Sequence, residues 1–367
     1  MIDSFLANKL QNRLKLLLRV IYYYCTVCLV LLYIYVYYGY INDTKEINNE
    51  ITQNTDAFYA QNISCSDNTF PTPNGCAPCI NGTFGFSGWS ECKPLLNCSD
   101  IALQVHLNER TFRGMVKEKW LADWNGHRVV YVNCSSTRVK TQCLRGMTRM
   151  EELQGPFVTR LIGRCHEKLE IVTAYYKHGS ANNLNRLLQK PEFSQYNNIQ
   201  TRFQLIVDYV KIMNYLHNSP IGIRVMCDTA SLRKLLTQYL ITDDFHLVVN
   251  DLDNTPDARD ENGILCANRK ELLQFVAPEQ RWPFNGSVPF RSDLKPTYDE
   301  KIDIWKIPPV VERILGDVNG SRFTKSKLRR VMERCRATDP RQRPTANEVL
   351  QRLLRVQRLI RNILFDP

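Results

Sequence analysis

Two aspartates and a glutamine in the C-terminal half of this 367-residue chain have the side chains and the spacing for chemistry on a hydroxyl group. Asp228 stands in Met-Cys-Asp, Gln238 opens the run Gln-Tyr-Leu-Ile, and Asp251 follows thirteen residues later in Asn-Asp-Leu-Asp. A carboxylate within hydrogen-bond reach can take the proton of a hydroxyl, and carboxylate and amide oxygens are ligands for Mg²⁺. We therefore expect Asp228 to act as a base, and Asp251 and Gln238 to hold a metal ion.

Asp251 and Asp253 also have a simpler interpretation, as a polar turn after the strand expected at Leu247 to Val249. Taken alone, a short acidic motif of this kind favours the turn. Its distance from Asp228, which suits a shared site, favours the metal ion instead. Whether Asp253 also binds metal stays open at this point.

The segments around these residues follow one another in the order found in the lower lobe of protein kinases. There a catalytic-loop Asp accepts the substrate proton, while an Asn five residues later and the Asp of Asp-Phe-Gly hold metal ions. Here Gln238 takes the place of the Asn, so the loop is longer by about five residues than in kinases. The five segments are Met226-Cys227-Asp228, Asn250-Asp251-Leu252-Asp253, Ala277-Pro278-Glu279, Asp303-Ile304-Trp305 and Arg343-Pro344-Thr345.

Three further residues in these segments are expected to stabilise the lobe rather than to act in catalysis. Glu279 and Arg343 resemble the ion pair that braces kinases, since a desolvated carboxylate needs a hydrogen-bonded cation and a guanidinium offers a planar fork. Asp303 resembles the helix carboxylate that supports the backbone of the catalytic loop. We expect all three to be structural.

The hydrophobic pattern predicts a strand-rich region followed by long helices. Asn125-Gly126 between two apolar runs indicates a hairpin, and apolar residues at steps of three and four indicate helices. A small β-rich N-lobe and a helical C-lobe give an α+β, bilobal protein-kinase-like fold. The expected strands are 115–123, 128–134, 157–165 and 169–176, and the expected helices include 140–153 and 201–217.

Residues 20–41 contain no charged side chain and are long enough to cross a bilayer as a helix. Four basic residues precede this run, and cytoplasmic flanks carry the positive excess. We expect an uncleaved type II signal anchor, with a cleaved signal peptide as the alternative. Seven Asn-x-Ser/Thr sequons agree with translocation of the rest, at Asn42, Asn62, Asn81, Asn97, Asn133, Asn285 and Asn319.

Thirteen cysteines are present, of which two lie in the expected anchor. Cys76-x-x-Cys79 could bind zinc, but the cluster around it contains no histidine, and a translocated chain meets an oxidising compartment. Disulfides are therefore the better interpretation. Eleven cysteines remain beyond the anchor, so at least one must be free or pair with another chain.

The composition is that of a globular protein, with 44% hydrophobic and 23% charged residues. Its 48 Lys and Arg exceed the 37 Asp and Glu, giving a formal charge of +11. These basic residues are dispersed, apart from a run at 325–330, and no nucleic-acid motif accompanies them. We expect no nucleic-acid partner, but a basic surface that tolerates an anionic nucleotide.

The quoted segments resemble the protein O-mannose kinase family, atypical kinases of the secretory pathway. Similarity covers roughly residues 79 to 350, and the run 298–308, Tyr-Asp-Glu-Lys-Ile-Asp-Ile-Trp-Lys-Ile-Pro, is its most specific part. The resemblance implies ATP as donor, with Mg²⁺ or Mn²⁺. It implies as acceptor the 6-hydroxyl of an O-linked mannose extended by GlcNAc and GalNAc, on a dystroglycan-type glycoprotein.

The resemblance also implies a lysine at the ATP phosphates. The expected third strand, Arg128 to Asn133, contains none, and Lys117 on the preceding strand is the substitute. An ammonium on a flexible stem could still reach the phosphates from there, although a solvated strand lysine is the alternative. Only Gly114 stands in the expected glycine-rich loop, and Gly146 occupies the helix position of the lysine's usual Glu partner. The partner of Lys117 thus stays open.

We expect four parts in the chain: a cytoplasmic tail at 1–19, the anchor at 20–41, a lumenal tether and Cys-rich stalk at 42–100, and a protein-kinase-like domain at 101–357. The endoplasmic reticulum membrane is the expected location, with the Golgi as the alternative. An active lumenal glycan kinase is the expected function. A catalytically inactive, glycan-binding or scaffolding membrane protein competes with it because the glycine-rich loop is degraded. A receptor kinase facing the cytosol conflicts with the charged flanks and the sequons.

Overall fold

The computed structural model describes residues 65, 68–72, 75–113, 117–134, 140–227, 229–259, 263–266, 275–284 and 288–365. These residues fall into two compact units. The expected tail and anchor, most of the tether, and Asp228 lie outside the described residues. Within the ranges that are described, no helix combines the length and the hydrophobicity needed to cross a bilayer.

The smaller unit contains Cys65 and most of a two-stranded sheet formed by β1 (Thr69–Thr72) and β2 (Gly75–Pro78). A disulfide joins Cys65 to Cys76 on β2. A two-stranded sheet buries too little apolar surface to be stable on its own. The covalent link therefore contributes much of the order in this part of the chain.

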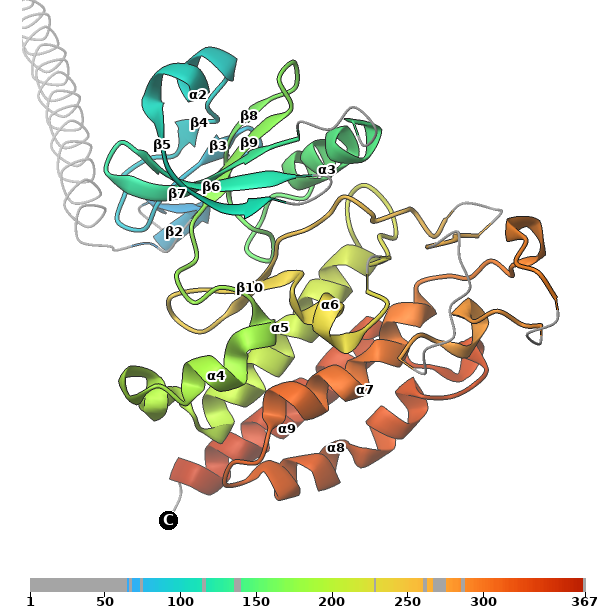
Figure 1. Cartoon of the computed structure of the whole chain (residues 1–367). Helices are drawn as coiled ribbons and strands as arrows, with labels where there is room; N and C mark the ends of the chain where they lie inside the picture. The colour runs from blue at the N-terminus through green and yellow to red at the C-terminus, as the bar shows by residue number, and fades with distance from the viewer. Residues whose placement is uncertain are drawn as a thin grey trace, which may run out of the picture. The chain divides into compact units, whose positions relative to one another are not determined.

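The larger unit contains a five-stranded antiparallel sheet in the order β5-β6-β7-β9-β8 (Figure 1). The predicted hairpin at Asn125-Gly126 is confirmed: both residues have positive φ, 48° and 80°, as a type I′ turn requires. The strands are β5 (Val105–Arg113), β6 (Glu118–Trp124), β7 (His127–Asn133), β8 (Leu161–Cys165) and β9 (Glu170–Ala174). Helix α3 (Lys140–Glu152) contacts β8, and it matches the helix expected at 140–153.

The strand expected at 157–165 is shorter than predicted, because its first residues pair elsewhere. Val158 forms a parallel bridge with Val249, Phe157 O accepts from Val249 N at 2.9 Å, and Thr159 N donates to Val249 O at 2.8 Å. These residues therefore leave the five-stranded sheet and hold β11 (Leu247–Val249) instead. The apolar pattern of the segment does not distinguish between these two pairings.

Disulfides join the N-terminal elements of the larger unit, as the cysteine pattern predicted. Cys79 pairs with Cys92 around the small sheet of β3 (Thr83–Phe84) and β4 (Lys93–Pro94). Cys98, the first residue of α2 (Cys98–Gln104), pairs with the last residue of β8. Cys335 is buried and unpaired, so the odd cysteine is confirmed. The remaining bridges are Cys134–Cys143 and Cys227–Cys266.

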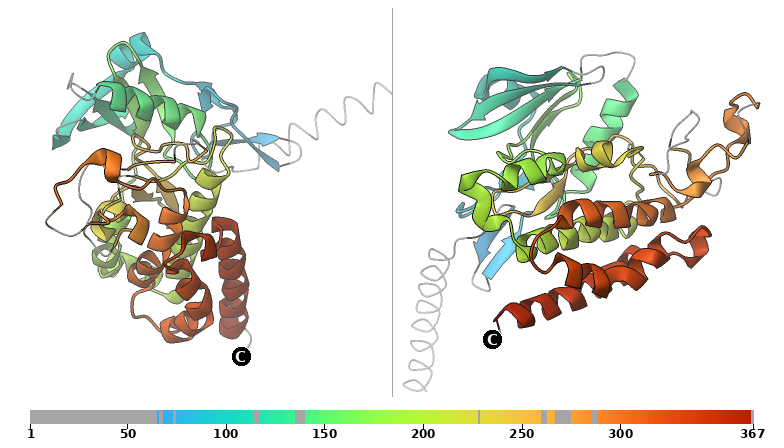
Figure 2. Two further views of the ribbon diagram at one scale, coloured as in Figure 1. Left: turned by 90° about the vertical axis from the view of Figure 1, so that its right-hand side faces the viewer. Right: turned by 60° about the horizontal axis from the view of Figure 1, so that its bottom comes forward.

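Helix α5 (Ile199–His217) is the centre of the helical part, which Figures 1 and 2 show on one side of the sheet. It contacts α7, α9 and β11, and nearly all its apolar side chains are buried in one continuous core. It begins two residues before the predicted 201, because Asn198 caps it through Thr201 N at 2.9 Å. The other helices are α4 (Leu184–Leu188), α6 (Leu232–Leu236), α7 (Lys301–Leu315), α8 (Ser321–Cys335) and α9 (Ala346–Phe365).

Among the described residues, short 3₁₀ helices connect the helices of this part. They are η2 (Ala181–Asn183), η3 (Pro191–Tyr196), η4 (Pro278–Gln280), η5 (Ser292–Leu294) and η6 (Pro340–Gln342). The predicted ion pair of Glu279 and Arg343 joins η4 to the residue after η6, with N–O distances of 2.5 and 2.8 Å. Arg343 Nη1 also donates to Lys301 O at the start of α7. Because this guanidinium is fully buried, its fork fixes three segments at once.

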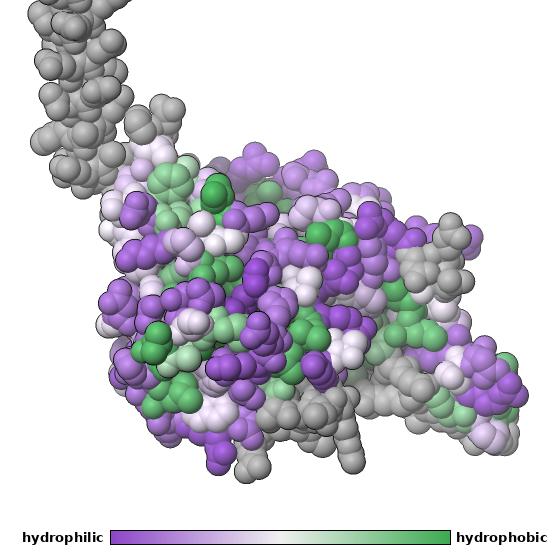
Figure 3. All heavy atoms as spheres, turned by 90° about the horizontal axis from the view of Figure 1, so that it is seen from above, coloured by the Kyte–Doolittle hydropathy of each residue, from purple (hydrophilic) through white to green (hydrophobic). Residues whose placement is uncertain are grey.

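A mixed α/β architecture with a five-stranded sheet and a helical part is compatible with a kinase-like fold. On the face drawn in Figure 3, hydrophilic residues predominate and hydrophobic ones lie in small separate groups. Scattered exposed apolar residues such as Leu103 are normal on a protein surface and need no partner.

Candidate active site

A short hairpin brings together the two residues predicted to hold metal. Strand β10 (Tyr239–Ile241) pairs with β11 so that Tyr239 lies opposite Val249. Asn250 N then donates to Gln238 O at 2.8 Å, which places the backbone of Gln238 one residue from Asp251. Gln238 is 2% exposed, whereas the side chain of Asp251 is 28% exposed. The hairpin therefore leaves the Asp251 carboxylate partly exposed to solvent, whereas the side chain of Gln238 is buried.

Lys117, the predicted phosphate-binding lysine, lies at this hairpin. Its ammonium is 2.6 Å from Asp253 Oδ2 and 3.4 Å from Asp251 Oδ1. Asp253 N in turn donates to Asp251 Oδ1 at 3.4 Å. The partner that the sequence left open is thus Asp253, the residue in the place of the glycine of Asp-Phe-Gly.

The charges of Lys117, Asp251 and Asp253 shift one another's pKa values. Burial alone would lower the pKa of Lys117, but the charges of Asp251 and Asp253 outweigh it and raise the pKa above its usual value. Burial would raise the pKa of Asp251, but Lys117 and Lys119 hold it below its usual value. For Asp253, burial prevails over Lys117 and raises the pKa to about 6. At neutral pH two carboxylates therefore face the one ammonium of Lys117.

Two carboxylates at the end of β11 suit a divalent cation, with Lys117 and Lys119 as nearby positive charges. The ionised carboxylate of Asp251 and the amide oxygen of Gln238 are the donor types that Mg²⁺ and Mn²⁺ accept. Across the described part of the chain, no group of three or more His, Cys, Asp or Glu side chains could hold a metal ion by itself. A metal here would therefore need further oxygens from a ligand, as is usual for Mg²⁺ beside nucleotide phosphates.

Gly146 on α3 explains how Asp253 reaches Lys117. A Cβ atom at Gly146 would stand 1.8 Å from Asp253 Oδ1 and 2.8 Å from its Cγ. The carboxylate thus occupies the space that a side chain on this helix would fill. In kinases the lysine is paired by a Glu on the corresponding helix. In this chain the acidic partner has moved from the helix to the segment after β11.

Gly146→Ala is expected to lower both the melting temperature and the affinity for Mg-ATP. Alanine normally stabilises a helix interior by about 0.5–1 kcal/mol relative to glycine, but here the methyl group must displace Asp253 from Lys117. Such overpacking typically costs about 1–3 kcal/mol. Thermal unfolding with and without Mg-ATP measures both effects.

Gly155→Ala is the matched control. Its Cβ would meet only Tyr215 Oη, at the ordinary contact distance of 3.9 Å. We expect this variant to bind nucleotide like the wild type. If Gly146→Ala instead raised the melting temperature and left Mg-ATP binding unchanged, Asp253 could not be packed against α3 as described.

Asp228 lies outside the described residues, but its neighbours on both sides are well defined. Met226 N donates to Asp303 Oδ2 at 2.9 Å, which confirms the predicted support of the loop backbone by Asp303. His217 Nε2 lies 3.4 Å from the same oxygen. Burial would raise the pKa of Asp303, but Lys306 and His217 hold it below the usual value. A buried carboxylate on α7 therefore anchors the loop two residues before Asp228.

Lys306 is a site residue that the sequence analysis missed. Its ammonium donates to Thr229 Oγ1 at 2.6 Å, to Met226 O at 3.3 Å and to Asp303 Oδ1 at 3.2 Å. Burying two charges costs several kcal/mol per ion unless good geometry and further hydrogen bonds repay it. Along the chain, Lys306 thus binds a residue before Asp228, Met226, and a residue after it, Thr229. The only signal in the sequence is a lysine one turn after Asp303, in an otherwise apolar stretch.

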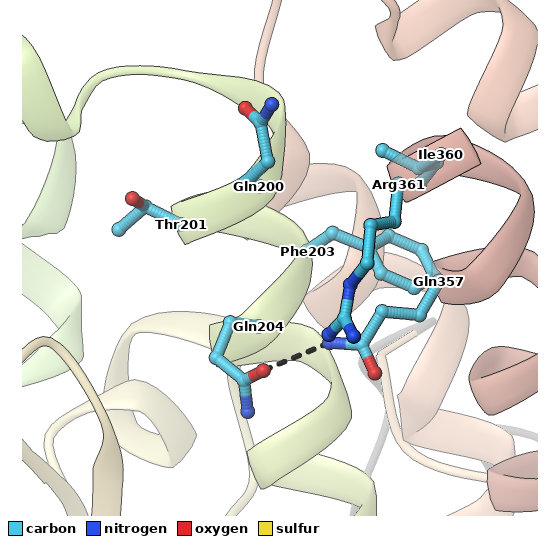
Figure 4. A pocket seen from close by; sticks show the side chains of 7 residues that line it. All are labelled: Gln200, Thr201, Phe203, Gln204, Gln357, Ile360 and Arg361. Carbon is cyan, nitrogen blue, oxygen red and sulfur yellow. Dashed lines mark hydrogen bonds between the residues drawn. The ribbon is translucent and has the colours of Figure 1, made fainter. Parts of the chain in front are cut away.

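Two cavities among the described residues lie away from the cluster of Lys117, Asp251 and Asp253. One, of about 260 Å³, lies between α5 and α9, where Gln357 Nε2 donates to Gln204 Oε1 at 2.8 Å (Figure 4). The other, of about 520 Å³, is a groove between α7 and α8. None of the predicted site residues lines either cavity, so neither is the candidate active site.

Curated proteins of similar sequence all bear the name Protein O-mannose kinase. The Homo sapiens protein is 38% identical over 308 residues, which cover 82% of this chain and 88% of that protein. The Gallus gallus protein is 40% identical over 284 residues, covering 77% and 80%. The Xenopus laevis protein is 38% identical over 284 residues, covering 77% and 81%. No family model matches the chain.

Proposed function

This chain belongs to the protein O-mannose kinase family, and from that premise we propose that it transfers the γ-phosphate of ATP to the 6-hydroxyl of O-linked mannose. The acceptor would be a GalNAc-GlcNAc-Man trisaccharide on a dystroglycan-type glycoprotein. The relatives' shared name supports the kinase activity and the O-mannose acceptor. The resemblance of residues 298–308 supports the finer choice of glycan.

One observation carries the proposal: the ammonium of Lys117 lies between Asp251 and Asp253 at the end of β11. Phosphoryl transfer depends on positioning and on neutralising charge at the phosphates. A lysine fixed by two carboxylates, one of them accessible, provides a positive group for the phosphates and an anionic group for a metal. A bilobal kinase fold, with the sheet as one lobe and α4 to α9 as the other, would place ATP between them.

Each residue has a distinct role in the proposed reaction. Asp251 and Gln238 would hold Mg²⁺ or Mn²⁺, which supplies neutralisation of the phosphate charge when bound. Lys117 would bind the α- and β-phosphates and keep them extended toward the acceptor. Asp228 would accept the proton of the mannose 6-hydroxyl as the new O–P bond forms and the bond to ADP breaks.

The proposal includes the topology expected from the sequence. Residues 20–41 would anchor the chain in the endoplasmic reticulum membrane, residues 42–100 would form a lumenal tether and stalk, and residues 101–357 the kinase domain. The five disulfides in the described part of the chain support an oxidising compartment. The sequons at Asn81 and Asn319 lie in described parts of the chain and would be among those available to glycosylation.

Transfer of labelled phosphate to the synthetic trisaccharide tests the proposal. The purified full-length chain, given ATP and Mg²⁺, is expected to phosphorylate the trisaccharide, and chelation of the metal should stop the reaction. A trisaccharide whose mannose lacks the 6-hydroxyl is the matched control and should receive no phosphate.

A protein that bound the trisaccharide but transferred nothing to it would contradict the proposal. That result would favour the inactive, glycan-binding scaffold, which the degraded glycine-rich loop also suggests. Transfer to both trisaccharides alike would contradict the assignment of the 6-position while leaving the kinase activity in place.

A further inference from the structure

The residue before the proposed base is a cysteine where protein kinases have an arginine. Kinases carry His-Arg-Asp at this point of the catalytic loop, whereas this chain has Met226-Cys227-Asp228. Phosphorylated activation loops are ordered through new pairs between arginine and the phosphorylated residue. A cysteine cannot make such a pair. Any attachment of the activation segment at this position must therefore be of a different kind.

Cys227 forms a disulfide with Cys266, and their Cα atoms are 4.7 Å apart. Cys266 lies between Asp251 and Glu279, in the part of the chain that corresponds to the kinase activation segment. Cys227 is 8% exposed. The catalytic loop and the activation segment are thus joined covalently, one residue from Asp228 and largely shielded from solvent.

Hydrogen bonds extend this attachment on both sides. Cys227 N donates to Asn254 O at 3.1 Å, three residues after Asp251. Cys266 N donates to Tyr298 Oη at 2.6 Å, and Ile264 N donates to Tyr298 O at 3.0 Å. Tyr298 belongs to a small buried core that also contains Val225, Ile264, Ala277, Ile302 and Trp305.

The disulfide therefore stands at the junction of three segments. Cys227 belongs to the catalytic loop and is hydrogen-bonded to the backbone that follows Asp251. Cys266 is hydrogen-bonded to Tyr298, which belongs to the core at the start of α7. Movement of Cys266 would be transmitted through the disulfide to Cys227, the residue before Asp228 in the chain. Phosphoryl transfer is sensitive to such movement, since a displacement of 1 Å can cost on the order of 10²-fold in rate.

We propose that the Cys227–Cys266 disulfide permanently holds Cys227, the residue before the proposed base, against residues 263–266, in place of the phosphorylation that orders the activation segment in other kinases. Cys227 and Cys266 are positioning residues, which touch neither ATP nor the acceptor. The inference rests on the proposed function. It adds that the enzyme is active as soon as its disulfides have formed, without an activating kinase.

Cys266→Ser tests this role in the full-length chain. We expect kcat for the trisaccharide to fall on the order of 10-fold to 10²-fold, and KM for ATP to change less, because the contacts of Lys117 with Asp251 and Asp253 do not include this bond. Amide hydrogen exchange at Ile264 should become faster. This second measurement needs no activity, so a failure of the proposed function would not conceal it.

The double variant Cys79→Ser/Cys92→Ser is the matched control, since it removes a disulfide that lies far along the chain from the loop. It is expected to lower the melting temperature while kcat stays that of the wild type. If it reduced kcat as much as Cys266→Ser, or if Cys266→Ser kept wild-type kcat and exchange, the positioning role would be overturned.

Wild-type protein gives a further test that does not depend on any variant folding. Treatment with a protein phosphatase is expected to leave kcat unchanged, and peptide mass analysis should find Cys227 linked to Cys266 in the active protein. A large loss of kcat after phosphatase treatment would overturn the proposal. So would full activity in protein whose Cys227 and Cys266 are both reduced.

Discussion

Replacing Asp228 by asparagine is expected to lower kcat for the trisaccharide by roughly 10²-fold to 10⁴-fold, the usual contribution of a general base. Asparagine keeps the size of the side chain but cannot accept a proton at neutral pH. The affinity for Mg-ATP should not change, since Lys117, Asp251 and Gln238 remain. Single-turnover transfer of labelled phosphate gives kcat, and a thermal-shift titration with Mg-ATP gives the affinity.

Asp293→Asn is a suitable control for this experiment. Its carboxylate is also lost, but it lies on η5 with a side chain 59% exposed and pairs with Arg291, two residues before it. We expect wild-type kcat from it. Equal rates for Asp228→Asn and the wild type would exclude Asp228 as the base, whatever the outcome for nucleotide binding.

The interpretation of that variant depends on the buried network around the loop. Asp303 and Lys306 are both 1% exposed, and together they hold Met226 and Thr229 on either side of Asp228. Neither contact involves the side chain of Asp228. The substitution therefore leaves the contacts of Asp303 and Lys306 with Met226 and Thr229 in place, and a thermal melt of the variant separates a loss of chemistry from unfolding.

The sequence predicted best those features that depend on local pattern. The hairpin at Asn125-Gly126 follows from turn chemistry, because both residues must adopt positive φ. Helix α3 follows from its apolar spacing. The pair of Glu279 and Arg343 was also predicted, although 64 positions separate the two residues. It could be found because its residues stand in short segments whose order along the chain resembles that of kinases.

The partner of Lys117 could not be found in the same way. A local sequence pattern does not predict which of many acidic residues will form an ion pair with a lysine that is distant in the chain. The expected position on α3 held a glycine, which indicated only that the usual partner was absent. Once Asp253 is seen at 2.6 Å from Lys117, with no room for a side chain on Gly146, the two departures from the kinase pattern explain each other.

Which cysteines pair with each other likewise could not be predicted from the sequence. The odd count of cysteines beyond the expected anchor predicted at least one that is free or pairs with another chain, and Cys335 is free and buried. Burial raises the pKa of this thiol to about 12, so it is a poor nucleophile. Spacing alone does not identify the partner of any cysteine. The link from Cys227 to Cys266 depends on how the activation segment folds back onto the catalytic loop.

Asp251→Asn is expected to abolish metal-dependent binding of ATP and to lower kcat/KM by roughly 10³-fold, equivalent to about 4 kcal/mol. The wild-type chain should gain about 2.7 kcal/mol of stability when Mg-ATP is present at 100 times its Kd. The variant should show no such gain. Its fold should persist without ligand, because Lys117 keeps its closer partner Asp253. A thermal-shift titration with Mg²⁺ at fixed ATP measures the difference.

Asp243→Asn provides the matched control, because it makes the same change on the same hairpin. Asp243 lies in the turn between β10 and β11, its side chain is 67% exposed, and its partner is Lys177 at 3.2 Å. Both variants lose one negative charge, so any general effect of charge on ATP binding is common to them. A Mg²⁺-dependent shift that survived in Asp251→Asn would contradict the metal role of Asp251. A shift lost from both variants would instead point to long-range charge, because of these two aspartates only Asp251 is proposed to contact the ion.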